Sequence, residues 1–132
     1  MIGLDTNVLV RYITADDATQ TEQAARFIER CCTPDDPGFV DRVALCELVW
    51  VLSGGHGYSR AQVAAVVVGL LASRDIKLED EESVRGALSM YERAGIDFAD
   101  ALICQVNRVR GCEATATFDR RAAKLAGFIR VA

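Results

Sequence analysis

The chain opens with MIGLDTNVLVRYI (residues 1–13), in which a short apolar run, the polar triplet Asp5-Thr6-Asn7 and a second apolar run follow one another. We expect residues 2–5 to form a short buried strand and residues 8–14 a short helix. A carboxylate between two apolar segments needs a partner. Asp5 is therefore a helix cap, a nucleophile or one ligand of a metal site whose other members lie elsewhere.

The rest of the chain alternates between helical and strand patterns. Helices are expected over 20–31, 42–53, 59–73, 81–95, 97–111 and 120–126, and strands over 38–41, 75–80, 112–119 and 128–132. Strands that alternate with helices through short connections predict an α/β fold. We expect one domain over residues 1–132, a three-layer α/β/α sandwich with a mostly parallel central sheet.

Composition bounds the class of protein. Of the 132 residues, 51% are hydrophobic and 26% are charged, which is typical of a compact globule. The longest apolar stretch, residues 63–72, is well short of the roughly 20 residues that a membrane span needs, and the start resembles no secretory signal. Five cysteines without a C-x-x-C pair argue against a disulfide framework or a thiolate zinc site. We read the cysteines as small apolar residues and expect a cytoplasmic protein that binds no membrane.

The single histidine and the distribution of charge limit the kinds of catalysis and binding that the chain can perform. His56 is the single histidine, which excludes catalysis by a histidine pair and any multi-histidine metal site. It lies in a GGHG segment and is read as a solvated loop residue. The net charge is −4, but residues 105–132 carry six basic and two acidic groups. This segment is either a phosphate-contacting rim or an ordinary mixed-charge surface.

Four acidic residues stand out by their positions. Asp5 and Asp119 are the last residues of expected strands, Asp100 falls in the first turn of an expected helix, and Glu47 is embedded in the strongly apolar segment 42–53. Ligands of parallel α/β sheets bind outside the carboxyl ends of the strands. The strand-end acids are therefore expected near a binding site.

Asp5 and Glu47 have different structural alternatives. An N-cap role suits Thr6 or Asn7 better than Asp5, which belongs to the expected strand. A carboxylate on a helix as apolar as 42–53 is expected to be protonated, metal-bound or paired with an arginine that the sequence does not identify.

The later acids are as easily explained by local structure as by function. Asp97 and Asp100 form a D-x-x-D pattern like a capping box, with Asp97 as the N-cap. Asp119 is a turn residue or the cap of the helix expected over 120–126.

Taken together, the four carboxylates indicate a cation. Two carboxylates ~4 Å apart repel each other by about 4 kcal/mol at an effective dielectric constant near 20, so a convergent cluster needs raised pKa values or a bound cation. A set of oxygen ligands without histidine or cysteine suits Mg²⁺ or Mn²⁺. Metal-assisted hydrolysis of phosphodiesters is chemistry that such a site performs well.

Four segments carry a family resemblance when read in order: LDTNVLVRYI (4–13), CELVWVL (46–52), GIDFADALI (95–103) and TFDRRAAKL (117–125). With them the chain resembles the PIN domain, and specifically the VapC-type ribonuclease toxins of bacterial toxin–antitoxin pairs. The resemblance covers nearly the whole chain. Any one of the four segments alone would be a weak indication.

The resemblance implies a parallel-sheet α/β/α fold with a Mg²⁺- or Mn²⁺-dependent endoribonuclease site. Asp5, Glu47 and Asp100 match the family's three principal acidic positions, and Asp119 matches a fourth, more variable one. Thr6, Asn7 and Thr117 match polar residues around the pocket, and Asp97 matches a further acid whose role is less settled. Family membership also implies a homodimer and a cognate antitoxin whose C-terminal segment occludes the site.

The expected mechanism follows from this assignment. Asp5 and Asp100 bind the metal, and Glu47 and Asp119 complete or support the site. A water activated by the metal attacks an RNA phosphodiester in line with the 3′-oxygen leaving group, which gives 5′-phosphate and 3′-hydroxyl ends. A structured RNA with single-stranded loops is the expected substrate.

Two further surfaces are open to interpretation. Arg120, Arg121 and Lys124 are candidates to contact the RNA backbone, or they form a solvated basic helix. Trp50 and the apolar residues 65–72 either form a dimer interface or antitoxin groove, or belong to the core, which is the preferred reading.

Two alternative functions remain. The first is a non-catalytic module that binds RNA or a protein through a PIN-like fold. The second is a phosphatase of the haloacid-dehalogenase type with Asp5 as nucleophile. That chemistry needs a second aspartate two residues on, where this chain has Asn7.

Overall fold

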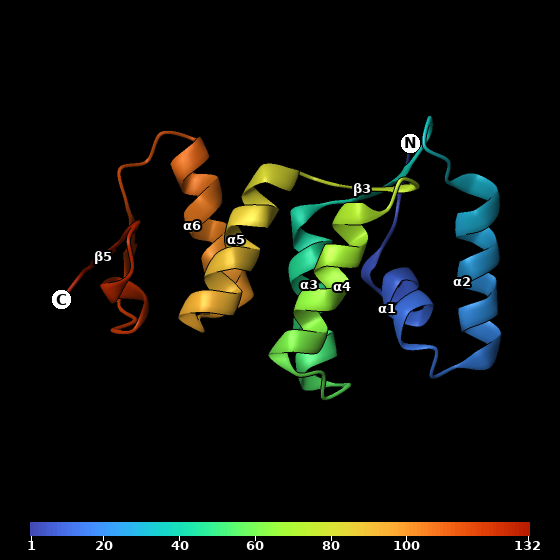
Figure 1. The fold of residues 1–132 in the computed structure, drawn as a ribbon, viewed down its shortest axis with the longest axis horizontal. Coiled ribbons are helices and arrows are strands. Elements are labelled where there is room, and N and C mark those ends of the chain that lie inside the picture. Colours follow the sequence, from blue (N-terminus) through green and yellow to red (C-terminus); the bar gives the residue numbers. More distant parts are fainter. The chain divides into compact units, whose positions relative to one another are not determined.

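The computed structural model describes residues 1–132, which group into two compact units, Met1–Glu81 and Glu82–Ala132. The N-terminal unit contains β1 (Ile2–Gly3), α1 (Thr6–Thr14), α2 (Ala18–Cys31), β2 (Gly38–Val40), α3 (Arg42–Gly54), α4 (Arg60–Ala72) and β3 (Ile76–Leu78). The C-terminal unit contains α5 (Glu81–Ala94, which begins at the unit boundary), α6 (Phe98–Val109), β4 (Thr115–Thr117), the 3₁₀ turn η1 (Ala122–Lys124) and β5 (Phe128–Arg130) (Figure 1).

Three parallel strands form the sheet of the N-terminal unit, in the order β1-β2-β3. Ile2 is in register with Gly38, and Gly38 with Ile76. A side chain at Gly38 would place its Cβ 2.8 Å from Leu4 Cδ1 and 2.9 Å from Cys32 Sγ. Glycine therefore lets the central strand pack closely against its neighbours.

Every helix of the N-terminal unit begins at a residue whose side chain caps it. Asp5, Asp17 and Asp41 accept hydrogen bonds from first-turn N–H groups of α1, α2 and α3. Ser59 and Gln62 form a reciprocal capping box on α4. Because these caps satisfy N–H groups that no helical partner reaches, they fix where each helix starts.

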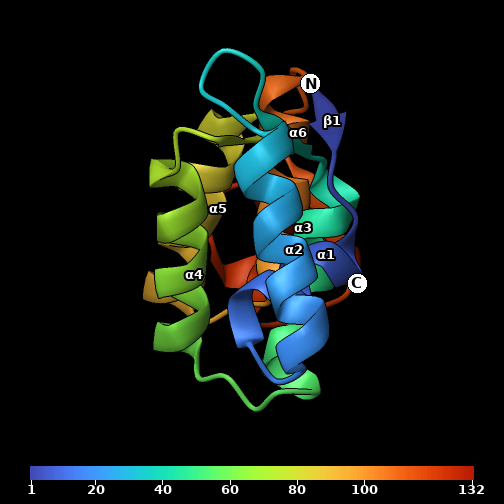
Figure 2. The ribbon, with the colours of Figure 1, turned by 90° about the vertical axis from the view of Figure 1, so that its right-hand side faces the viewer.

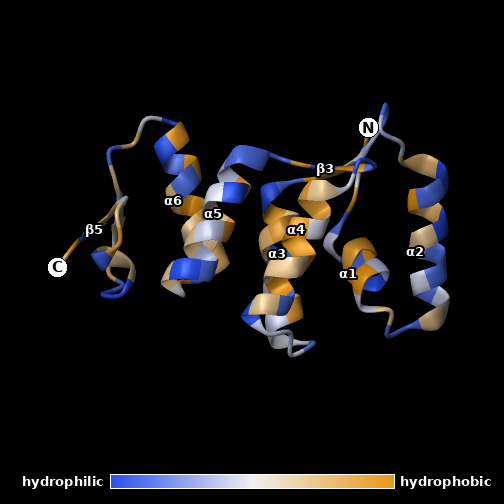
Figure 3. Ribbon diagram, viewed as in Figure 1, coloured by the Kyte–Doolittle hydropathy of each residue, from blue (hydrophilic) through white to orange (hydrophobic).

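The core of the N-terminal unit lies where α3 and α4 pack together and where α1 contacts both α2 and α3. Its fully buried side chains are mostly aliphatic: Leu9, Leu45, Leu48, Leu52, Val63 and Val67. α3 and α4 are the most continuously apolar helices (Figure 3). Helix α2 runs beside α1 and is joined to it by a short turn (Figure 2). Burial of each such side chain stabilises the fold by about 1.5–3 kcal/mol.

The C-terminal unit has its own small core. Tyr91 and the fully buried Phe98 meet in an edge-to-face contact with ring centroids 5.9 Å apart. Strands β4 and β5 are parallel, with Thr115 opposite Phe128. Gly127 adopts φ +95°, and a Cβ there would lie 2.7 Å from Cys104 Sγ. Glycine is therefore required at the entry to β5.

The predicted α/β class with parallel strands is confirmed, because every strand pairing in both units is parallel. The helix expected over 120–126 is wrong: only the single turn η1 forms, because Leu125 is extended and Gly127 has a positive φ. The expected strands are shorter than predicted, and Leu4 and Asp5 lie beyond β1. One domain over residues 1–132 stays a prediction. None of the helices combines the length and apolar character that crossing a bilayer requires.

Candidate active site

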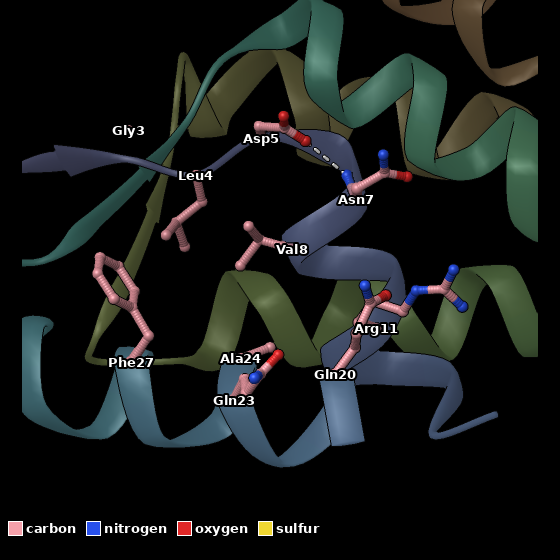
Figure 4. Close-up of a pocket in the computed structure, with 10 residues that line it drawn as sticks. All are labelled: Gly3, Leu4, Asp5, Asn7, Val8, Arg11, Gln20, Gln23, Ala24 and Phe27. Atoms are coloured by element: carbon pink, nitrogen blue, oxygen red, sulfur yellow. Dashed lines mark hydrogen bonds between the residues drawn. The ribbon is translucent and has the colours of Figure 1, made fainter. Parts of the chain in front are cut away.

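Asp5 lies between β1 and α1 and is the N-cap of that helix. The backbone N–H of Asn7 donates to Asp5 Oδ1 at 2.6 Å (Figure 4). The expectation that Thr6 or Asn7 caps the helix is wrong, because Thr6 is already its first helical residue. The partial positive charge of a helix N-terminus favours a carboxylate here. Since only Oδ1 is engaged, Oδ2 is available to a further ligand.

Glu47 lies on the exposed side of α3. The hydroxyl of Thr6 donates to Glu47 Oε1 at 3.3 Å. No basic side chain of the N-terminal unit is paired with it, so this unit supplies no arginine partner of the kind considered from the sequence. The apolar segment around Glu47 does not bury its side chain. Glu47 lies on a solvent-exposed face of α3 with Val43 and Trp50, which are 70% and 77% exposed.

A cavity of about 560 Å³ is lined by three acidic residues of the N-terminal unit. Its polar lining residues are Asp5, Thr6, Asn7, Asp41 and Glu47. Sequence reasoning did not single out Asp41, although it follows β2 as Asp5 follows β1, and the same strand-end signal would have found it. Asp41 Oδ1 accepts from Ala44 N at 2.8 Å, so one of its oxygens is occupied as a helix cap.

Asp100 is the half-buried acid of the C-terminal unit, in the first turn of α6. Burial raises the pKa of its carboxyl group, and the neighbouring carboxylates of Asp97 and Asp119 raise it further. Asp97 is the N-cap of α6, as predicted, but its side chain makes no capping hydrogen bond, so the capping-box reading is wrong. Asp97 and Asp119 therefore each lie near enough to Asp100 to disfavour its charge, an effect that a bound cation would relieve.

Asp119 follows β4 and organises the turn that leads to η1. Its Oδ1 accepts from the backbone N–H groups of Arg121 at 2.8 Å and Ala122 at 3.2 Å. Its own N–H donates to the hydroxyl of Thr117 at 3.0 Å. The turn role considered for Asp119 is thus confirmed, whereas the alternative role as a helix cap is wrong, because the N-cap of η1 is Arg121. Arg120, Arg121 and Lys124 are all exposed, and their contact with RNA stays a prediction.

The donor sets of both units suit a hard cation such as Mg²⁺ or Mn²⁺, because every candidate ligand is an oxygen atom. The structure places Asp5 and Glu47 at one cavity in the N-terminal unit, and Asp97, Asp100 and Asp119 near one another in the C-terminal unit. Neither unit by itself holds three His, Cys, Asp or Glu side chains in an arrangement that would bind a metal ion. The site of four carboxylates stays a prediction.

Three expectations about other residues need correction. His56 is not a solvated loop residue: its side chain is 20% exposed, and Nε2 lies 3.4 Å from Asp16 Oδ2 without hydrogen-bond geometry. Trp50 is exposed and does not belong to the core. Cys32 and Cys104 are buried as expected, and burial raises the pKa of each thiol, but Cys31 and Cys112 are exposed and Cys46 is half-buried.

Comparison with known proteins identifies a family and a related protein. The sequence model of the PIN domain family matches residues 2–128. A protein of Aquifex aeolicus (strain VF5) described as VapC ribonuclease is 26% identical over 122 residues, which cover 92% of this chain and 90% of that protein. The resemblance read from the four sequence segments is confirmed by both matches. With a match over nearly its whole length, the chain belongs to the PIN domain family.

Proposed function

We propose that this protein is a Mg²⁺- or Mn²⁺-dependent endoribonuclease and the toxin of a toxin–antitoxin pair. Its membership of the PIN domain family and its similarity to a VapC ribonuclease support this assignment. The observation that carries the proposal is Asp100. Its half-buried carboxylate lies near two further carboxylates, and no hydrogen bond or ion pair within its unit compensates the charge.

The proposed metal ligands are Asp5 and Asp100, with Glu47 and Asp119 completing or supporting the set. When bound, the cation would lower the pKa of a water molecule and offset the charge that develops on the phosphoryl group. The chain's own hydrogen bonds restrict these carboxylates. Asn7 N fixes one oxygen of Asp5, the hydroxyl of Thr6 holds Glu47, and two backbone N–H groups hold Asp119.

The reaction we propose is hydrolysis of an RNA phosphodiester. A carboxylate of the set orients the attacking water in line with the 3′-oxygen leaving group, and the products carry 5′-phosphate and 3′-hydroxyl ends. Arg120, Arg121 and Lys124 are exposed beside Asp119 and are placed here as contacts to the RNA backbone. Single-stranded loops of a structured RNA are the proposed substrate, because their phosphates and bases are accessible.

The proposal includes partners as well as a reaction. A cognate antitoxin would inhibit the enzyme, and a homodimer and a cytoplasmic location are further predictions. The molar mass of the purified protein, measured by light scattering alone and after coexpression with its antitoxin, tests the homodimer and the complex together.

RNA cleavage with and without EDTA tests the proposed function. We expect cleavage of structured RNA in Mg²⁺ or Mn²⁺ that EDTA abolishes, and losses of at least ~100-fold in Asp5→Asn and Asp100→Asn. Asp35→Asn and Glu113→Gln are the matched controls in the two units, because each removes an exposed acid outside the proposed set. Cleavage that persists in EDTA or in Asp5→Asn would contradict the proposal.

No observation in the structure supports either of the two alternative functions. A non-catalytic binding module gives no reason for the uncompensated carboxylate of Asp100. A phosphoaspartate enzyme needs an acid where Asn7 stands, and here the backbone N–H of Asn7 binds the oxygen of the would-be nucleophile Asp5. The end chemistry of the RNA products separates the nuclease from a phosphatase.

A further inference from the structure

A second cavity, of about 410 Å³, lies between α1 and α2 of the N-terminal unit (Figure 4). Its walls are mainly apolar and include Leu4, Val8, Ala24 and Phe27. The volume falls in the range of about 300–1,000 Å³ that small-ligand sites occupy. Phe27 lies at one end of the group in Figure 4 and Arg11 at the other. The cavity therefore offers a planar, apolar ligand an aromatic contact.

Three amide side chains line this apolar cavity: those of Asn7, Gln20 and Gln23. None of them makes a side-chain hydrogen bond within the unit, although the backbone N–H groups of Asn7 and Gln20 are engaged in capping. The guanidinium of Arg11 is already paired with Asp16 at 3.2 Å. Apart from the carboxylate of Asp5, the free polar side chains of the cavity are thus neutral amides, each of which both donates and accepts.

The α1–α2 cavity adjoins the candidate active site, because the two cavities share lining residues. Gly3, Leu4, Asp5 and Asn7 line both this cavity and the one that contains Glu47. A nucleotide whose phosphate lies at Asp5 would therefore have the α1–α2 cavity immediately beside it. Because the two cavities share these residues, a nucleic-acid strand bound at Asp5 is a better candidate occupant than an unrelated small molecule.

We propose that the α1–α2 cavity binds an unpaired adenine base of the RNA, next to the phosphodiester that is cut. This inference rests on the proposed function and adds a specificity subsite to it. Proteins read single-stranded RNA by packing splayed-out bases on aromatic side chains and bonding to their edges. Asn and Gln amides form paired hydrogen bonds with adenine, whereas arginine reads guanine, and Arg11 is already paired with Asp16. Phe27 packs against the base, and Gln20 and Gln23 read its edge.

Binding of short RNAs in EDTA tests the cavity without any cleavage. The probes are two fluorescein-labelled hexaribonucleotides, one of uridines alone and one with a single central adenosine, measured by anisotropy at low ionic strength. We expect about tenfold tighter binding of the adenosine probe, within the range that one paired amide contact supplies. Gln23→Leu keeps the side-chain size, removes the amide and should abolish the difference.

Thr19→Ala is the matched control, because Thr19 is an exposed residue of the same helix that does not line the cavity. It should keep the tenfold preference. Equal binding of the two probes by the unmodified chain, or a preference that survives in Gln23→Leu, would overturn the proposal. Equal binding would also leave the cavity to another kind of occupant, such as a segment of a protein partner.

Cleavage-site mapping on a randomised RNA in Mg²⁺ separates this inference from the proposed function. The inference predicts adenine enrichment beside the cut that disappears in Gln23→Leu while uridine-only sites are still cut. Cleavage without adenine enrichment refutes the proposed subsite but agrees with the proposed nuclease function. Adenosine-selective binding without any cleavage supports the subsite and refutes the proposed reaction.

Discussion

Replacing Asp100 with asparagine should stabilise the folded protein at neutral pH, although the residue is proposed to be essential for activity. Burial raises the pKa of Asp100, and Asp97 and Asp119 add to this effect. A group whose pKa is raised by folding favours the folded state below its unfolded pKa, near 3.9, and this contribution is lost as the pH rises through the folded pKa. At pH 7 the charged carboxylate therefore destabilises the fold.

We expect the gain in Asp100→Asn to be on the order of 1 kcal/mol, because the asparagine keeps the shape and removes both the burial of a charge and the repulsion from two neighbours. For a chain of 132 residues this corresponds to an increase of about 3–6 °C in Tm. Thermal unfolding followed by circular dichroism, without metal, measures it. Glu113→Gln removes an exposed acid of the same unit and should leave Tm unchanged.

The pH dependence of the difference in Tm tests the cause of this stabilisation more specifically than the Tm at one pH. The difference in Tm between Asp100→Asn and the unmodified chain should shrink as the pH falls through the folded pKa of Asp100 toward 4. Adding Mn²⁺ should stabilise the unmodified chain and not the variant, because a ligand that binds only the folded state raises its stability. A variant that is less stable at pH 7, or a difference that does not change with pH, would refute the reasoning.

Three further predictions follow from contacts in the structure. Asp119→Ala removes the acceptor for two backbone N–H groups and should lower the free energy of unfolding by about 1 kcal/mol. Asp119→Asn keeps an acceptor, so chemical denaturation should give nearly the same free energy of unfolding as for the unmodified chain, although RNA cleavage falls. Gly38→Ala should destabilise by about 1–3 kcal/mol in urea, because its Cβ would meet Leu4 Cδ1 at 2.8 Å. Thr6→Val removes the 3.3 Å bond to Glu47, and calorimetry should show weaker Mn²⁺ binding with little change in Tm.

The sequence predicted the positions of Asp5 and Asp119 relative to the strands better than it predicted the surroundings of the candidate residues. The strand-end rule found Asp5 and Asp119, and both follow strands in the structure after a gap of one residue. It did not identify Asp5 as the helix cap, because that depends on whether Thr6 is the last extended residue or the first helical one. Helix boundaries shift by one or two residues with local geometry, and the sequence pattern cannot resolve such a shift.

The surroundings of Glu47 show a second reason for failure. Residues 42–53 have so many apolar side chains that the core is the preferred interpretation for Trp50, yet Val43, Glu47 and Trp50 recur at helical spacing and share an exposed face. The α1–α2 cavity could not be predicted either. It depends on how two helices pack, and neither helix shows it alone.

Calorimetric titration of the purified protein with Mn²⁺ tests the central claim most directly, because it measures the proposed metal site without relying on an RNA substrate. The claim is that Asp5 and Asp100 both contribute to one cation site. We expect saturable Mn²⁺ binding that is lost in Asp5→Asn and in Asp100→Asn and retained in the controls Asp35→Asn and Glu113→Gln. Mn²⁺ binding that survives either of the first two substitutions unchanged would contradict it.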